Sequence, residues 1–293
     1  MRILVTGRHG QVARSLAERA GQYPCLDLHF AARPECDLAV PGSAASAIQA
    51  ERPALVVSAA AYTAVDKAEQ EPDQAHRINA DAAGEIAVAA AAVGAPLIHI
   101  STDYVFAGDG NAPMREDEAI APLGIYGRTK ADGEAAVRAG QGDHLILRTA
   151  WVYSPFGGNF VKTMLRLAGD RDEISVVADQ VGSPTNALDL AEVILVLASR
   201  RLNGDSSGWG ETYNAAGSGQ ASWADFAAEI MRASGSSTRI RPISTADFPT
   251  PAERPSWSVL DGRKLREGFG LALPEWRQSL PPVVSRLLKQ QGA

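Results

Sequence analysis

Short β-branched and aliphatic runs alternate with alanine-rich stretches over the first half of this chain. The runs that predict strands are Arg2–Thr6, Leu26–Ala31, Leu55–Ser58, Pro96–Ser101 and His144–Thr149. The stretches that predict helices are Gln11–Ala20, Ser43–Glu51, Gln74–Val93 and Tyr126–Ala139. Such alternation implies a parallel sheet with right-handed crossovers and helices on both faces. The sequence therefore predicts an α/β fold with a Rossmann-like doubly wound parallel sheet, whose ligands lie at the carboxyl ends of the strands.

After Trp151 the pattern becomes less regular. The predicted elements are a helix over Asn159–Ala168, a strand over Ile174–Val177, a buried helix over Leu188–Arg200, a loop over Asn203–Gly210, a helix over Phe226–Arg232 capped near Ser222, an extended or turned segment over Pro242–Pro255, and an amphipathic helix over Leu280–Gln290 that starts with Pro281-Pro282. We interpret residues 1–153 as the Rossmann-like domain, completed by a helix and a strand from about 186–216. Residues 154–185 and 217–293 are predicted to form a smaller, irregular α/β lobe over the mouth of the sheet.

Composition excludes several classes of protein. The net charge is −6, so the chain has no electrostatic footprint for nucleic acid or for an anionic membrane. The longest apolar run, Ile86–Ile98, is too short and interrupted to span a bilayer, and the amino-terminal residues do not resemble a signal peptide. The five histidines lack the spacing of a zinc site, and Glu116-Asp117-Glu118 is predicted to be a solvated charge run. We expect a cytoplasmic, soluble protein.

A glycine-containing turn follows the first predicted strand. Gly7 and Gly10 permit a tight turn and let backbone amides approach a pyrophosphate at the start of the next helix, with Gln11 and Val12 following. An ordinary strand-to-helix turn remains the alternative. Arg33 and Asp37 follow the second strand, where the adenosine ribose of a dinucleotide would lie. The arginine favours the 2′-phosphate of NADPH, unless it is only a solvated loop residue.

Small residues follow the third predicted strand. The segment Ala59 to Thr63 includes Ala61 and Tyr62 and has no bulky aliphatic side chain, so a flat cofactor can lie against its backbone. Close packing of a helix would explain the alanines nearly as well. Farther along, Asp66, Lys67 and Glu69 are predicted to be solvated loop charges.

Tyr126 and Lys130 stand four residues apart on a predicted helix, so their side chains share one face. A phenol is a poor acid–base catalyst until a fixed positive charge favours its phenolate, and Lys130 can supply that charge. Thr102, after the fourth strand, can hold a substrate oxygen. The three residues predict a site that moves a proton to or from a carbonyl or alcohol, although the Tyr–Lys spacing alone can arise by chance. His99, inside the fourth strand, is predicted to be a packed histidine.

Longer motifs support this interpretation. Gly7-x-x-Gly10-Gln11, Ser101-Thr102-Asp103-Tyr104-Val105-Phe106 and Tyr126-Gly127-x-x-Lys130 occur together with Asp179-Gln180-Val181-Gly182-Ser183-Pro184-Thr185 and Arg254-Pro255-x-x-Ser258-x-Leu260-Asp261. From residue 1 to about 290 the chain resembles the dTDP-4-dehydrorhamnose reductase family of the extended short-chain dehydrogenases/reductases. The resemblance implies that NADPH or NADH delivers hydride to C4 of dTDP-4-dehydro-β-L-rhamnose (dTDP-4-dehydro-6-deoxy-L-mannose), which gives dTDP-β-L-rhamnose for cell-surface polysaccharide.

The resemblance also implies roles for individual residues. Tyr126 is the general acid, Lys130 lowers the pKa of that tyrosine and binds the nicotinamide ribose, and Thr102 hydrogen-bonds the C4 oxygen. The residues that line the sugar pocket are Asp103, Tyr104 and Trp151. The positions that match cofactor contacts are Gly10, Gln11, Val12, Asp37, Leu38, Ala61, Tyr62 and Thr63.

Two positions depart from part of the family. Some members form a dimer bridged by Mg²⁺ through glutamates, and two of those positions here are Ser15 and Leu188, which cannot replace carboxylate ligands. We therefore expect a monomer or a homodimer without a metal bridge, and we leave a requirement for Mg²⁺ open.

Two alternative functions are compatible with parts of this pattern. The alternatives are another nucleotide-sugar 4-ketoreductase or epimerase of the same superfamily, and a non-catalytic subunit that resembles the β-subunit of methionine adenosyltransferase. The presence of Thr102, Tyr126 and Lys130 disfavours the non-catalytic alternative. The nucleotide and the sugar are not fixed by these motifs.

Overall fold

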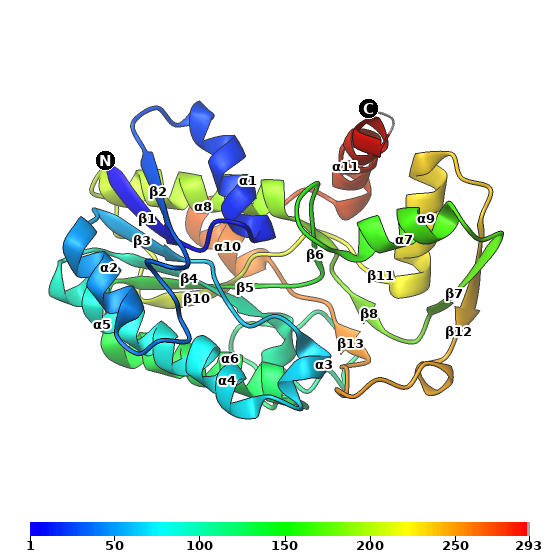
Figure 1. Ribbon diagram of the computed structural model, residues 1–293, viewed down its shortest axis with the longest axis horizontal. Coiled ribbons are helices and arrows are strands. Elements are labelled where there is room, and N and C mark those ends of the chain that lie inside the picture. The colour runs from blue at the N-terminus through cyan, green and yellow to red at the C-terminus, as the bar shows by residue number, and fades with distance from the viewer. Residues whose placement is uncertain (292–293) are drawn as a thin grey trace.

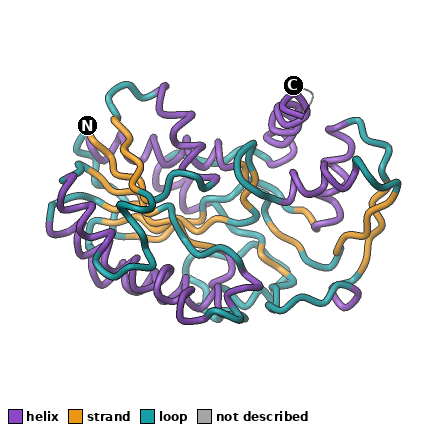
Figure 2. Tube along the Cα trace, in the orientation of Figure 1, coloured by secondary structure: helices purple, strands orange, loops and turns teal. Residues whose placement is uncertain are grey.

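A parallel six-stranded sheet forms the centre of the larger part of the computed structural model, on the left in Figures 1 and 2. The structure describes residues 1–291. The strand order of the sheet is β10-β5-β4-β3-β1-β2, and every neighbouring pair is parallel. The strands are β1 (Arg2–Thr6), β2 (Asp27–Ala31), β3 (Leu55–Ser58), β4 (Leu97–Thr102), β5 (His144–Thr149) and β10 (Glu211–Asn214). The Rossmann-like doubly wound sheet and its first five predicted strands are confirmed.

Helices cover both faces of this sheet (Figure 1). One face carries α1 (Gln11–Arg19) and α8 (Ala187–Leu202), and the other carries α2 (Ser43–Glu51), α5 (Ala82–Ala92) and α6 (Ile125–Gly140). Within β1, Ile3 and Val5 pack with the first group of helices, whereas Leu4 packs with the second. The strands are apolar on both sides because a parallel sheet of this kind buries both faces.

The helix predicted over 74–93 is not continuous. It is divided into α4 (Pro72–His76), a π-helical turn (Arg77–Asp81) and α5, and the short helix α3 (Val65–Ala68) precedes it. The π-helical turn carries Asn79, whose side chain accepts from the backbone N–H of Tyr62 at 2.8 Å and donates to the Tyr62 carbonyl at 3.1 Å. Asn79 therefore connects the π-helical turn to the segment after β3. The periodic pattern of the sequence predicts neither this contact nor the break in the helix.

The smaller lobe is built from short strands and three helices, on the right in Figure 1. Its strands are β7 (Glu173–Val177), β8 (Val181–Gly182), β11 (Ala221–Ser222), β12 (Arg239–Ile243) and β13 (Trp257–Ser258). The short strands β6 (Val152–Tyr153) and β9 (Thr185–Asn186) pair with each other where the chain passes between the sheet and the lobe. Its helices are α7 (Phe160–Ala168), α9 (Trp223–Ser234) and α11 (Trp276–Gln291), and α10 (Arg263–Phe269) lies between β13 and α11 in the chain. Short 3₁₀ turns occur at Ala20–Gln22, Asp103–Val105 and Thr245–Asp247. The lobe has its own core, separate from those of the sheet.

The starts of α9 and α11 can be compared with their predicted positions. The cap predicted at the start of α9 is confirmed, because Ser222 and Asp225 form a reciprocal capping box. The last helix begins at Trp276, before Pro281-Pro282, so the predicted start was wrong. Trp276 and Leu280 are almost fully buried in the core of the lobe, and this burial outweighs the two backbone donors that the prolines lack.

No helix in residues 1–291 is long and apolar enough to cross a membrane.

A buried ion pair joins α6 to β5. The Arg148 guanidinium donates to both carboxylate oxygens of Glu134, at 2.8 and 2.7 Å, and both residues are 1% exposed. Arg138 donates to the same carboxylate at 2.8 Å. Burial by itself raises the pKa of Glu134, but the two arginines outweigh it and hold the pKa below its ordinary value.

Replacing one partner of this pair should strongly destabilise the fold. We expect Glu134→Gln to lower the free energy of unfolding by about 3–5 kcal/mol, because Arg148 is left buried without a counter-charge. Urea unfolding at neutral pH measures the change. The difference should shrink as the pH falls through the lowered pKa of Glu134, because protonation removes the charge in the wild type as well.

The matched control is Glu51→Gln, which breaks the exposed ion pair with Arg2 and should cost less than about 1 kcal/mol. Equal losses in the two variants would contradict the importance of the buried pair.

Candidate active site

The candidate site lies where β4 ends and α6 begins. Thr102 is the last residue of β4, and the 3₁₀ turn Asp103–Val105 follows it directly. Gly127, in the first turn of α6, lies so close to this turn that a Cβ on it would stand 2.1 Å from the Tyr104 carbonyl oxygen. Only glycine permits that approach, and it brings Tyr126 next to the residues that follow β4.

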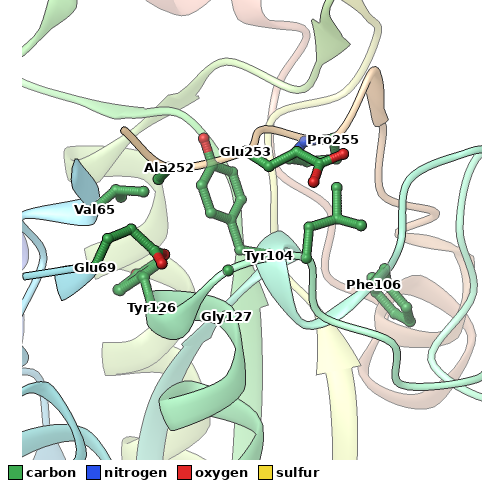
Figure 3. A pocket seen from close by; sticks show the side chains of 11 residues that line it. Val65, Glu69, Tyr104, Phe106, Tyr126, Gly127, Ala252, Glu253 and Pro255 are labelled. Carbon is green, nitrogen blue, oxygen red and sulfur yellow. The ribbon is translucent and has the colours of Figure 1, made fainter. Parts of the chain in front are cut away.

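Tyr126 and Tyr104 line the same small pocket (Figure 3). Their ring centroids are 5.7 Å apart, and the rings meet edge to face. Figure 3 shows Val65 and Glu69 on one side of Tyr104 and Phe106 on the other. The remaining lining residues are Leu123, Gly124, Gly127, Ala252, Glu253 and Pro255. The pocket thus joins α3 and α6 of the large domain to the proline-rich segment that precedes β13.

Tyr126 is protonated at neutral pH. Burial raises its pKa to about 12, and the neighbouring Thr102 hydroxyl opposes part of that shift. The net shift of this pKa is upward, so a lowering by Lys130 is not visible in it and stays a prediction. The reason is that burial dominates at Tyr126, while the ammonium group of Lys130 is engaged elsewhere. A protonated phenol is nevertheless the form that can act as an acid.

The ammonium group of Lys130 is held by two groups of strand β4. Its Nζ donates to the Ile100 carbonyl oxygen at 2.7 Å and lies 3.2 Å from Nε2 of His99, whose Nδ1 is 3.1 Å from the Ser58 hydroxyl. Burial lowers the pKa of Lys130 to about 8 and holds that of His99 well below its ordinary value. The imidazole is therefore neutral, so its Nε2 accepts from the ammonium and its Nδ1–H donates to Ser58.

His99 is thus packed, as predicted, but its contact with Lys130 was missed. The partners of His99 lie on β3 and α6, and no spacing within the sequence identifies such a contact.

Thr102 and Asp103 form a linked pair. The Thr102 hydroxyl donates to Oδ1 of Asp103 at 2.9 Å and accepts from the backbone N–H of Tyr104 at 3.2 Å. Burial raises the pKa of Asp103 to about 7, although the Thr102 and Ser258 hydroxyls oppose the shift. The threonine hydroxyl is therefore fixed in position at the end of β4, and its proton points toward a carboxyl group that titrates near neutrality.

The turn after β1 has the shape that a dinucleotide needs. Gly7 has φ +89°, and a Cβ on it would lie 3.2 Å from the Cβ of Ala60, so the turn packs closely against the segment after β3. Gly10 precedes α1 with no side-chain cap, and a side chain there would meet nothing within 4 Å. The first N–H groups of α1 are therefore free to meet an anion across open space, which fits a pyrophosphate.

The side chain of Gln11 makes contacts that the local sequence did not predict. It donates to the Val152 carbonyl at 3.1 Å and accepts from the Ser154 hydroxyl at 2.8 Å and from Asn159 Nδ2 at 3.0 Å. Asn159 also caps α7 of the smaller lobe. The side chain of Gln11 therefore joins the turn to the smaller lobe, while Val12 lies half-buried beside it.

The residues predicted for the adenosine side lie along the ends of β2 and β3. Arg33 is exposed after β2, and Arg8, from the glycine turn, donates to the Phe30 carbonyl there at 3.1 Å. Arg8 is a second cation at this place that the sequence analysis did not consider. Asp37 accepts from the backbone N–H of Ala39 at 3.0 Å, so its carboxylate stabilises a local turn. Leu38 is buried, whereas Ala61, Tyr62 and Thr63 keep accessible surface after β3.

Two of the three predicted loop charges are structural. Glu69 accepts from the backbone N–H of Ile125 at 2.8 Å, at the start of α6, and Asp66 accepts from Arg254 at 2.8 Å. Both side chains keep accessible surface, and that of Asp66 is 43% exposed, so they are solvated as predicted, but their distant partners were missed. The loop placement was wrong for Asp66 and Lys67, which lie in α3. Lys67 is exposed, as predicted.

The acidic run Glu116-Asp117-Glu118 and the two positions that are glutamates in metal-bridged relatives do not form a metal site in this structure. Asp117 and Glu118 are exposed, whereas Glu116 accepts from the backbone N–H of Asn214 at 2.8 Å. Ser15 and Leu188 are buried. Within residues 1–291, no group of three or more His, Cys, Asp or Glu side chains could hold a metal ion.

The sheet, the glycine turn before α1, and Tyr126 and Lys130 one turn apart on α6 define a short-chain dehydrogenase/reductase. The model of the RmlD substrate binding domain family matches residues 1–289. The dTDP-4-dehydrorhamnose reductase of Sinorhizobium fredii is 45% identical over 292 residues, which cover 98% of each chain. The chain belongs to the dTDP-4-dehydrorhamnose reductase family, and its members are oxidoreductases.

Solved structures agree with this assignment. A dTDP-4-dehydrorhamnose reductase from Clostridium acetobutylicum superposes with a TM-score of 0.92 at 38% identity, covering 98% of this chain and 100% of that one. The enzyme from Bacillus anthracis, solved in complex with NADP, has a TM-score of 0.90 at 37% identity and covers 97% and 99%.

The contact between His99 and Lys130 can be tested by stability. We expect His99→Leu to lower the free energy of unfolding by about 1–3 kcal/mol, because the buried ammonium and the Ser58 hydroxyl each lose a partner. His99→Gln should lose less, since its side-chain oxygen can still accept from Lys130. Urea unfolding measures both, with His29→Gln, at a partly exposed histidine away from this contact, as the control. Equal losses for leucine and glutamine would contradict the contact.

Proposed function

We propose that this protein reduces the C4 ketone of dTDP-4-dehydro-β-L-rhamnose to dTDP-β-L-rhamnose, with hydride from NADPH and with NADH as a possible substitute. The observation that carries the proposal is the placement of Tyr126 at the pocket beside Thr102, with Lys130 one helical turn away. We propose that residues 1–153 and 186–216 hold the cofactor. Residues 154–185 and 217–293 would then hold the nucleotide sugar.

The protein's own groups have separate tasks in this reaction. When bound, the nicotinamide cofactor supplies a hydride to the ketone carbon, and negative charge then develops on the C4 oxygen. Tyr126 donates its phenolic proton to that oxygen, and the Thr102 hydroxyl donates a hydrogen bond to it after leaving Asp103. A preorganised acid and donor of this kind stabilise charge in the transition state without reorganisation. Asp103, Tyr104 and Trp151 line the sugar.

Lys130 assists from the cofactor side. Its ammonium is directed by the Ile100 carbonyl and His99, and from there it can bind a ribose hydroxyl of the nicotinamide. Once a ribose hydroxyl and the developing phenolate lie nearby, its positive charge favours the ionised form of Tyr126. The lowering of the tyrosine pKa therefore belongs to the loaded enzyme in this proposal.

Gly7, Gly10 and the backbone N–H groups of Gln11 and Val12 would hold the pyrophosphate. Asp37, Leu38, Ala61, Tyr62 and Thr63 would lie along the adenosine half. Arg33, with Arg8 near it, would bind the 2′-phosphate, which is why we propose NADPH as the preferred cofactor.

We propose that the protein acts in the cytoplasm as a monomer or a homodimer without a metal bridge. The burial of Ser15 and Leu188 supports this proposal, because neither side chain is free to reach a shared ion. A sedimentation coefficient that falls when EDTA is added would contradict it.

The substrate is tested by NADPH oxidation with dTDP-4-keto-6-deoxyglucose plus a 3,5-epimerase, compared with a GDP-linked 4-keto sugar. We expect stoichiometric oxidation with the dTDP substrate and a lower KM for NADPH than for NADH. An epimerase would turn over substrate without net consumption of NADPH, and a non-catalytic subunit would oxidise no NADPH. Either result would overturn the proposal.

Removal of the acid should affect turnover more than binding. We expect Tyr126→Phe to lower kcat by about 10²–10⁴-fold, the range typical of general acid catalysis, with little change in the affinity for NADPH. The control is Tyr23→Phe, whose hydroxyl bonds Glu192 away from the pocket and should leave kcat unchanged. A Tyr126→Phe variant with wild-type turnover would remove Tyr126 from the mechanism.

A further inference from the structure

Trp151 adopts a backbone conformation that is uncommon for a side chain of its size. Its φ is +46°, in the left-handed region, and the only other non-glycine residue with positive φ in residues 1–291 is Arg52. Trp151 stands between β5 and β6, where the chain leaves the sheet for the smaller lobe. Conformations of this kind persist only where the surrounding structure imposes them, and they concentrate at functional sites.

The indole of Trp151 is stacked on that of Trp223. The ring centroids are 3.5 Å apart, and the ring planes differ by only 4°. Trp223 is the first residue of α9, where the capping box of Ser222 and Asp225 fixes the start of the helix. Phe160 of α7 packs against the same ring, with centroids 4.6 Å apart. The capping box and Phe160 therefore hold Trp223 in place within the smaller lobe. Its ring is stacked on Trp151, which lies just after the sheet strand β5.

A second element of the lobe also contacts Trp151. A Cβ on Gly182 of β8 would lie 2.4 Å from Cε2 and 2.5 Å from Nε1 of the indole, so the strand backbone lies directly against the ring. Gly182 has no side chain that would push the indole away. The plane of the Trp151 ring is consequently set by α9 and β8, both of which belong to the smaller lobe.

Trp223 is not simply a core residue of the lobe. It is only half-buried, and it is packed against the buried cluster of the lobe without being part of it. Trp151 is likewise half-buried and contacts that cluster and also the smaller cluster around Val105 and Phe106, beside the candidate active site. The stack therefore joins the core of the lobe to the wall of the pocket region.

We propose that Trp223 is a positioning residue for the sugar: it holds the indole of Trp151 in the plane against which the deoxysugar ring of the nucleotide sugar packs. This inference rests on the proposed function, in which Trp151 contacts the sugar. An aromatic ring held in place loses no conformational freedom when the ligand arrives, so the stack contributes to affinity by preorganisation. Without Trp223, the indole loses the ring that is stacked on it.

The contribution of the sugar to binding can be measured separately by comparing three ligands. dTDP-rhamnose contains the sugar, whereas dTDP contains only the nucleotide, and NADPH binds to the other domain in the proposed function. Loss of Trp223 should therefore weaken dTDP-rhamnose selectively. A purely structural role would weaken all three ligands, or would lower stability without changing their relative affinities.

The test measures the Kd of dTDP-rhamnose, dTDP and NADPH by calorimetry in full-length variants. We expect Trp223→Leu to weaken dTDP-rhamnose about tenfold while dTDP and NADPH change less than about twofold, a size typical for the loss of one aromatic pair. Trp223→Phe keeps a stacking face and should recover most of the affinity. KM for the keto sugar should rise in parallel with that Kd, with a smaller change in kcat.

Two further variants make the outcome decisive. Trp209→Phe removes a tryptophan that packs near Arg201 and β10, away from the stack, and should change none of the three affinities. Trp151→Leu should reproduce the selective loss seen with Trp223→Leu. If Trp223→Leu weakens dTDP and dTDP-rhamnose equally, or weakens neither, the positioning role is wrong.

If Trp151→Leu also spares dTDP-rhamnose, the contact of Trp151 with the sugar is wrong and the inference fails with it. If the wild-type protein binds dTDP-rhamnose no more tightly than dTDP, the proposed substrate itself is in error.

Discussion

The candidate site depends on how closely α6 approaches the rest of the large domain. A Cβ on Gly127 would stand 2.1 Å from the Tyr104 carbonyl oxygen, and a Cβ on Gly133 would stand 2.1 Å from that of Asn79. The helix can therefore touch both the turn after β4 and the π-helical turn before α5. This double contact sets Tyr126 beside Thr102 and directs Lys130 toward His99, and Glu69 fixes the start of the same helix.

Two side chains connect the sheet to the smaller lobe at the junction between the two parts of the molecule. Gln11 leaves the glycine turn of the sheet and binds Ser154 and Asn159, while Trp151 leaves β5 and stacks on Trp223. Both contacts arise at the carboxyl edge of the sheet, where ligands of such folds bind. The smaller lobe thus supplies support to residues whose proposed partners are the cofactor and the sugar.

Much of this arrangement follows from local sequence patterns. Strands buried on both faces, the Gly7 turn and the spacing of Tyr126 and Lys130 are local, so they can be predicted from the sequence. The contacts of His99, Asp66 and Glu69 join segments far apart in the chain, and no local pattern encodes them. The start of α11 was misplaced for a similar reason, because the burial of Trp276 in the lobe overrides the local effect of two prolines. The pKa of Tyr126 depends on burial and so needed the folded structure.

In the function proposed for this protein, Tyr126 and its neighbours serve a hydride transfer to C4 of a dTDP-linked sugar. Turnover with NADPH that carries deuterium at the transferred position tests it most directly. The account predicts one deuterium in dTDP-rhamnose, bonded to C4 and visible by mass spectrometry and NMR, for each NADPH consumed. Product without deuterium, or deuterium at another carbon, would contradict it.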